Sequence, residues 1–412
     1  MTQRNDQIRY TCIAGGVTAS FGFSAAGVAV GVKDSSDLTK KDVALLYTDL
    51  DAVTAGVFTT NRVKASPLLL TQERVRGGVA RAVVINSGNA NSCNGTVGMA
   101  DARAMAAAAA QAVGVPEEQV LVASTGVIGQ PLPMERILSG VRSAADKLSP
   151  GGGHDAAEAI MTTDTVSKEA AALLELGGVQ AIIGGMAKGS GMIHPNMATM
   201  LCFLTTDVAI EAQLLQRALT DAVDQSFNMV SIDGDSSTND MVVLLANGAA
   251  GNQGITTMGA DYELFANALT DVCRYLAIAV ASDGEGATRL LEVQVRGASS
   301  MRDARLIAKS VVSSSLVKAA VFGQDANWGR IICAAGYSGA EINQDKIDIY
   351  IGDLLVAKNG AGLTFDNAQA IEQLSGDKVI FTLDLHAGAG EATAWGCDLT
   401  YDYVRINGLY RT

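Results

Sequence analysis

The chain has 412 residues, of which 48% are hydrophobic and 18% are charged, and this composition indicates an ordered globular protein with large cores. The 43 acidic residues outnumber the 30 basic ones, so the net charge is −13, and we expect small-molecule substrates instead of nucleic acid. No apolar run reaches about 18 residues and the N-terminus is polar, so we expect no membrane partner and a cytoplasmic location.

The first half of the chain alternates β-type and helical runs. In chain order, the pattern predicts strands over 43–49 and 81–88, a helix over 100–114 that stops at Gly114, a strand over 119–124 and a helix over 134–148. The glycine-rich segment 149–155 resembles a flexible linker. A helix from 156 then runs into a polar loop, and a strand begins at 179.

The second half continues in the same style. Helices are expected over 210–227, 261–281 and 301–319, and strands over 199–210, 241–247, 288–297, 346–358, 378–385 and 392–406. Several of these strands alternate apolar and polar residues, which is typical of sheets with one covered face. The alternation of elements predicts an α/β fold of layered sheets covered by helices.

Cysteine and histidine usage limits the chemistry. The six cysteines (Cys12, Cys93, Cys202, Cys273, Cys333 and Cys397) are scattered with no CxxC pair, so we interpret them as reduced core thiols. The chain has only three histidines (His154, His194 and His386), and no His/Cys cluster suits a metal ion. We therefore expect no metal, and a nucleophilic site would have little histidine from which to draw its base.

The segment KGSGMIHPNMATML (188–201) places Lys188, His194 and Thr199 among glycines and apolar residues. The preceding GGMAKGSG is not a Walker A loop, because Lys188 precedes the last glycine instead of following it. SLVK (315–318) matches SxxK without the accompanying KTG, so an ordinary helix explains it better. His194 either serves as a base or hydrogen-bonds within its own loop.

Thr199 poses the sharpest question, because a threonine hydroxyl needs a base to act as a nucleophile. If its hydroxyl attacks the Ala198 carbonyl and the chain is cut there, Thr199 gains a free α-amine with a pKa of about 7.7–8.0. That amine can serve as the base for its own hydroxyl. The alternative is that Thr199 is an ordinary β-former at the start of a strand.

Motifs along nearly the whole chain resemble those of the ornithine acetyltransferase (ArgJ) family, the bifunctional glutamate N-acetyltransferases and amino-acid acetyltransferases. Besides 188–201, they are INSGNANSCNG (85–95), ASTGVIG (123–129), IMTTDT (160–165), SIDGDSSTND (231–240), ASDGEGATRL (281–290), FGQDANWGRI (322–331) and INGLYRT (406–412).

The resemblance implies an ArgJ/DmpA-like fold that cuts itself between Ala198 and Thr199 into two intertwined chains. Residues 1–198 would form the α chain, with the oxyanion hole and part of the substrate site, and 199–412 the β chain, with Thr199 as nucleophile. The implied reaction moves acetyl from N2-acetylornithine to glutamate by a ping-pong mechanism in an α2β2 heterotetramer. No cofactor is implied, although acetyl-CoA can serve some members as a co-substrate. A related self-cleaving hydrolase or aminopeptidase is the alternative.

The resemblance also assigns site residues. Thr125 and Gly126 match the oxyanion-hole pair, although STGVIG alone could be a plain turn. The substrate-binding positions match Thr162, Lys188, Thr199, Glu285, Asn407 and Thr412. A lysine beside the nucleophile suits a substrate carboxylate, and a glutamate suits a cationic amine. Without the resemblance, Lys188 would be a solubilising residue and Glu285 a solvated turn residue.

Overall fold

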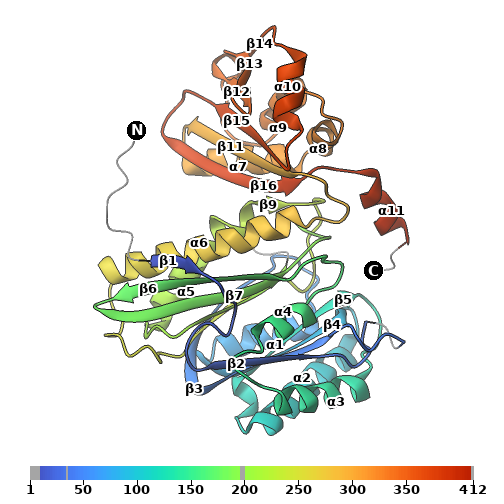
Figure 1. Cartoon of the computed structure of the whole chain (residues 1–412), viewed down its shortest axis with the longest axis vertical. Coiled ribbons are helices and arrows are strands. Elements are labelled where there is room, and N and C mark those ends of the chain that lie inside the picture. Colours follow the sequence, from blue (N-terminus) through green and yellow to red (C-terminus); the bar gives the residue numbers. More distant parts are fainter. Residues whose placement is uncertain (1–9, 34–35, 195–199, 410–412) are drawn as a thin grey trace.

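The computed structural model describes residues 10–33, 36–194 and 200–409. A mixed sheet of nine strands, drawn in the lower half of Figure 1, forms the larger lobe. Its strands are β1 (Tyr10–Ile13), β2 (Phe23–Val28), β3 (Val43–Phe58), β4 (Val79–Asn89), β5 (Val120–Val127), β6 (Lys168–Leu176), β7 (Val179–Lys188), β8 (Leu201–Thr206) and β10 (Met241–Ala246). Their order is β1-β6-β7-β8-β10-β3-β4-β5, with β2 paired to β3.

Helices cover both faces of this sheet. They are α1 (Ser66–Val75), α2 (Gly95–Val113), α3 (Met134–Asp146), α4 (Gly153–Ala159), α5 (Ala212–Asp224) and α6 (Ala260–Ser282). On β8, Leu201 and Phe203 face the core that contains α4, whereas Cys202 and Leu204 face the core that contains α5 and α6. Every residue of β8 is buried, which explains its continuous apolar sequence.

A second sheet of seven strands forms the upper lobe in Figure 1. It comprises β9 (Val230–Ser231), β11 (Leu290–Ala298), β12 (Asp348–Ile351), β13 (Leu354–Lys358), β14 (Ala361–Gly362), β15 (Lys378–Asp384) and β16 (Gly390–Cys397). The remaining helices are α7 (Met301–Ser313), α8 (Ser315–Phe322), α9 (Trp328–Gly336), α10 (Asn367–Leu374) and α11 (Tyr401–Leu409). The predicted α/β fold of layered sheets covered by helices is therefore confirmed.

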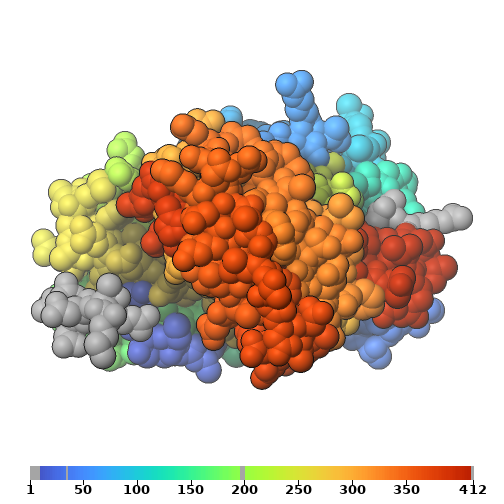
Figure 2. All heavy atoms as spheres, turned by 90° about the horizontal axis from the view of Figure 1, so that it is seen from above, coloured from blue at the N-terminus to red at the C-terminus, as the bar shows by residue number. Residues whose placement is uncertain are grey.

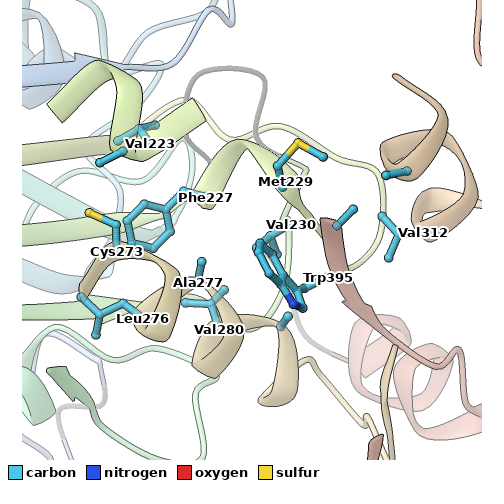
Figure 3. Close-up of a cluster of buried hydrophobic side chains, with 14 of the residues drawn as sticks. Val223, Phe227, Met229, Val230, Cys273, Leu276, Ala277, Val280, Val312 and Trp395 are labelled. Atoms are coloured by element: carbon cyan, nitrogen blue, oxygen red, sulfur yellow. The ribbon is translucent and has the colours of Figure 1, made fainter. Parts of the chain in front are cut away.

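Helix α6 lies between the two lobes and joins their cores. Figure 3 shows Phe227 beside Cys273 and Leu276 of α6, and Trp395 of β16 beside Val230. By length and composition α6 could also cross a membrane, although no uninterrupted apolar run of about 18 residues marks it in the sequence. Ten residues of α6 are buried in the core that both lobes share, so α6 has the character of a core helix.

The predicted linker at 149–155 is wrong, because this segment docks on β2. Ser149 and Ala25 exchange two backbone hydrogen bonds of 3.0 and 3.1 Å. A Cβ atom on Gly152 would lie 1.9 Å from the Ala25 carbonyl oxygen, so glycine permits close packing here instead of flexibility.

Three predicted elements in the second half also differ from the structure. The single helix expected over 301–319 is broken at Ser314, whose extended backbone and hydroxyl cap α8. The strand expected over 346–358 is a hairpin that turns at Gly352, where φ is 56°. The strand expected over 392–406 ends at Cys397, and α11 follows after Thr400, whose hydroxyl accepts from the backbone N–H of Tyr403.

The predicted halves 1–198 and 199–412 do not form separate layers. Strands β8 and β10, which follow residue 199, are inserted between β7 and β3, which precede it. Strand β8 is antiparallel to β7 and parallel to β10. The two halves thus share one sheet, while a cut between them remains a prediction.

Candidate active site

A cavity of about 340 Å³ opens where β5, β7, β8 and β10 meet segments from the second half of the chain. Six of the predicted site residues line it: Thr125, Gly126, Thr162, Lys188, Glu285 and Asn407. The other three predicted site residues, Ala198, Thr199 and Thr412, lie outside the described residues. Met200 and Leu201, which follow Thr199 in the sequence, also line the cavity.

Thr125 and Gly126 lie at the end of β5 and do not form the plain turn that the sequence left open. Gly126 has φ of 130°, and a Cβ atom there would lie 2.3 Å from the carbonyl carbon of Gly88 on β4. Only glycine allows β4 and β5 to approach this closely. The position of the neighbouring Thr125 hydroxyl is therefore set by the sheet.

Lys188 is buried at the end of β7, with 7% of its surface exposed. Its ammonium donates a hydrogen bond to the Thr125 hydroxyl oxygen at 3.2 Å. Because an ammonium cannot accept, the O–H of Thr125 remains able to donate to another group. Burial lowers the pKa of Lys188, and the negative charge of Asp164 opposes that shift.

Asp164 supports this end of the cavity from behind. One of its oxygens accepts from Lys168 and from the backbone N–H of Gly189, both at 2.7 Å, and the other accepts from the N–H of Thr162 at 3.0 Å. Burial would raise the pKa of Asp164, but the cations of Lys188 and Lys168 outweigh burial and hold it at about 2. Asp164 is therefore ionised at neutral pH and fixes the start of the 188–194 segment.

The opposite end of the cavity carries Glu285, which is buried, and Asn407 of α11. The Asn407 amide donates to a carboxylate oxygen of Glu285 at 2.7 Å. Gly191 makes room for Glu285, since a Cβ atom there would lie 2.4 Å from its carboxylate. The pKa of Tyr403, which also lines the cavity, is raised by burial and by Asp233.

His194 does not fill the role of a base. It is absent from the described residues that line the cavity, and its Nδ1 lies 3.0 Å from the Ser231 hydroxyl. Burial and the nearby Lys309 lower the pKa of His194 to about 4, so the ring is neutral at physiological pH. The alternative prediction, that His194 serves as a hydrogen-bonding residue, is correct, but its partner Ser231 lies on β9 and not in the loop that contains His194.

Sequence reasoning named none of the five residues of the SIDGDSSTND motif that line the cavity, which are Asp233, Asp235, Ser237, Asn239 and Asp240. The Asn239 amide donates to the backbone oxygens of Ala90 at 2.6 Å and Ser124 at 2.8 Å, and so holds the ends of β4 and β5 together. Asp240 lies buried in the cavity wall. The only available signal in the sequence was the resemblance of the whole motif to the ArgJ family.

The cysteines were predicted as core thiols, and this is wrong for half of them. Cys202, Cys273 and Cys397 are buried, whereas Cys12, Cys93 and Cys333 are exposed, and all six are free. Within the described ranges, no group of three or more His, Cys, Asp or Glu side chains is arranged to hold a metal ion.

Comparison with known proteins gives consistent matches. The sequence model of the ArgJ family matches residues 24–412. The "Arginine biosynthesis bifunctional protein ArgJ" of Symbiobacterium thermophilum is 58% identical over 400 residues, which cover 97% of this chain and 99% of that protein. The protein of the same name from Caldanaerobacter subterraneus is 51% identical over 395 residues, covering 95% and 97%.

Solved structures of similar proteins were also found. The arginine biosynthesis bifunctional protein argJ from Bacillus halodurans has 49% identity and a TM-score of 0.49, covering 50% of this chain and 98% of that one. The ornithine acetyltransferase from Mycobacterium tuberculosis, complexed with ornithine, has 44% identity and a TM-score of 0.43, covering 46% and 100%.

Proposed function

The chain belongs to the ArgJ family, and we propose that it moves acetyl from N2-acetylornithine to glutamate through an acetyl-enzyme on Thr199. It is an acetyltransferase of arginine biosynthesis. One observation above all supports the proposed mechanism. Six positions that match the family's functional residues come from separate segments of the chain and line one cavity.

The proposed cycle begins with cleavage of the Ala198–Thr199 bond, which frees the Thr199 α-amine. This amine takes the proton of the Thr199 hydroxyl, whose oxygen attacks the acetyl carbonyl. The Thr125 hydroxyl and the N–H of Gly126 would donate hydrogen bonds to the oxyanion that develops on the acetyl group. The Thr125 hydroxyl is able to donate because its oxygen already accepts a hydrogen bond from Lys188. Ornithine leaves, and glutamate then takes the acetyl group from Thr199.

The charged ends of the cavity suit the two amino acids. Ornithine and glutamate share an α-amino-acid skeleton, so one cation and one carboxylate can hold both. Lys188 would contact the substrate carboxylate, and Glu285 with Asn407 would contact an amine. Thr162 lines the cavity and donates its backbone N–H to Asp164, and Thr162 and Thr412 would complete the substrate contacts.

The remaining parts of the proposal follow from the same family. We propose that acetyl-CoA serves as an alternative acetyl donor for glutamate, and that no other cofactor takes part. The enzyme would work in the cytoplasm as an α2β2 heterotetramer of its own two chains.

Denaturing electrophoresis tests the cleavage step. Active wild-type protein should give two fragments near half size, one of them beginning at Thr199, and Thr199→Ala should give one folded, inactive, full-length chain. A single full-length band in active wild-type protein would contradict the mechanism.

Product analysis tests the transfer step. Incubation with N2-acetylornithine and glutamate should yield acetylglutamate and ornithine, and acetyl-CoA with glutamate should yield acetylglutamate. If free acetate dominates with or without glutamate, water is the acceptor and the protein is a related hydrolase instead.

A further inference from the structure

Asp240 is a buried carboxyl group in the wall of the active cavity with no role in the steps described so far. It directly precedes β10, and only 3% of its surface is exposed. Ser237 hydrogen-bonds to this carboxyl through both its side chain and its backbone. One oxygen, Oδ2, has no hydrogen-bond partner among the described residues.

Of the other three carboxyl groups that line the cavity, Asp235 is exposed, and Asp233 and Glu285 are already hydrogen-bonded. The Asp233 oxygens accept backbone hydrogen bonds from Met192 at 2.6 Å and Ile193 at 2.8 Å. Glu285 is bonded by Asn407 at 2.7 Å. An unpartnered buried carboxyl oxygen is costly, so its presence in the wall of a substrate cavity indicates a function.

The surroundings of Asp240 favour a protonated resting state. Burial raises the pKa of Asp240 well above its usual range, and the hydrogen bonds from Ser237 and the positive charge of Lys188 only partly oppose this shift. Lys188 is the charged group that faces Asp240, and Lys188 in turn faces Asp164, Lys168 and Glu285. A carboxyl group that holds a proton near neutral pH can both give and take one during a reaction.

The proposed acetyl transfer requires such a group. The ornithine amine departs from an amide and becomes an ammonium ion, so it must gain a proton besides the one that Thr199 loses. The glutamate amine arrives as an ammonium ion and must lose a proton before it can attack. The Thr199 α-amine carries the proton that moves between the Thr199 hydroxyl and the nitrogen, so a second group is available to act only if it carries the other proton.

We propose that Asp240 is a further catalytic residue, which gives its proton to the departing amine and takes one from the arriving ammonium. This inference rests on the proposed function. In the first half-reaction the C–N bond breaks, the Thr199 hydroxyl proton reaches the nitrogen through the α-amine, and Asp240 adds a second proton and becomes ionised. In the second, ionised Asp240 removes one proton from the glutamate ammonium, and the neutral amine attacks the acetyl-enzyme. Asp240 is then protonated again, and no other reactant is consumed.

Asp240→Asn tests the proposal, because asparagine keeps the size of the side chain and cannot carry the proton. The acetyl-enzyme is formed with N2-acetylornithine, freed of ornithine, and mixed with glutamate or with hydroxylamine, a nucleophile that is neutral at pH 7. In the variant, transfer to glutamate should fall about 100-fold at pH 7 and recover as the pH rises, while transfer to hydroxylamine changes by less than about threefold. Asp240→Glu should restore part of the glutamate rate.

Other outcomes would overturn the role of Asp240. An equal loss with both acceptors means that Asp240 is structural, and an unchanged glutamate rate means that it carries no proton. If Asp240→Asn does not fold or is not cut, the wild-type protein alone decides. At saturating glutamate, the ratio of the glutamate rate to the hydroxylamine rate should rise from pH 7 and level off once Asp240 is ionised, while most of the glutamate amine is still an ammonium ion. A ratio that keeps rising about tenfold per pH unit up to about pH 9 would show that only free amine reacts and would refute the proposal. Failure of the wild type to form any acetyl-enzyme would instead refute the proposed function.

Discussion

The two ends of the active cavity are held by different kinds of structure. At the oxyanion end, Thr125 of β5 and Lys188 of β7 belong to the same sheet, and both are buried and bonded to each other although β8, β10, β3 and β4 separate their strands in the strand order. At the amino-acid end, Glu285 lies in a loop and Asn407 on α11, a helix with no buried residue. Figure 2 shows α11, in dark red, on the outer flank of the molecule. The rigid end suits stabilisation of a transition state, and the peripheral end suits binding and release of two different amino acids.

Thr125→Val should break the oxyanion end and give the largest effect. The loss of one donor to the oxyanion should lower kcat by about 10²–10³-fold and leave KM nearly unchanged. Steady-state kinetics with N2-acetylornithine and glutamate measures both constants. Thr125→Ser, which keeps the hydroxyl, should retain most of the activity, and a rise in KM with kcat preserved would place Thr125 in substrate binding instead.

Asp164→Asn should destabilise the same end by about 2 kcal/mol at pH 7, because ionised Asp164 has a pKa of about 2 against its ordinary value of 3.8. A lowered pKa in the folded protein adds stability above the unfolded pKa, and that stability is lost as the pH falls through about 2. Thermal melting should therefore show a difference between wild type and variant that narrows below about pH 4. Asp221→Asn on the exposed surface of α5 is the matched control, and a pH-independent difference would contradict the role of the charge.

Asn407→Ala should loosen the amino-acid end without touching the chemistry. Loss of the 2.7 Å hydrogen bond to Glu285 should raise KM about tenfold, the size expected for one hydrogen bond to a charged group, and change kcat by less than about twofold. Arg405→Ala, on the same helix and pairing with Asp402, should change neither constant. A fall in kcat matching that of Thr125→Val would mean that the two ends do not differ as described.

His194→Gln should give the smallest effect on activity, because His194 belongs to neither end of the cavity. His194 is neutral and bonded to Ser231 outside the cavity, so glutamine can replace its hydrogen bond. We expect kcat/KM to change by less than about twofold at pH 7. A loss of 100-fold or more would restore the interpretation of His194 as a base.

The sequence predicted the rigid end better than the peripheral one. The runs that became β5 and β7 are apolar and bounded by glycine, and the motifs at their ends pointed to Thr125, Gly126 and Lys188. The strand predicted over 392–406 hid α11, because α11 buries no residue and so carries no helical period of apolar side chains. The orphaned oxygen of Asp240 could not have been predicted, since it depends on the register of β10 against β8.

The close approach of Gly152 to Ala25 illustrates the same limit. Three consecutive glycines indicate flexibility in an isolated segment, and only the position of β2 shows that a side chain would collide there. A run of glycines is thus compatible with a flexible backbone or with close backbone packing, and the neighbouring structure, here β2, decides which of the two occurs.

The position of β8 in the middle of the first sheet has a consequence for the lifetime of the assembled enzyme. A cut before residue 199 would leave a fragment whose first strand is bonded on one side to β7 of the other fragment and on the other side to β10 of its own. To separate the fragments, the hydrogen bonds of β8 to β7 and of β10 to β3 would have to break, and the hydrophobic cores on both faces of the sheet would have to open with them. Exchange of fragments between molecules should then be as slow as global unfolding, so the two fragments of one precursor should stay together for as long as the enzyme is folded.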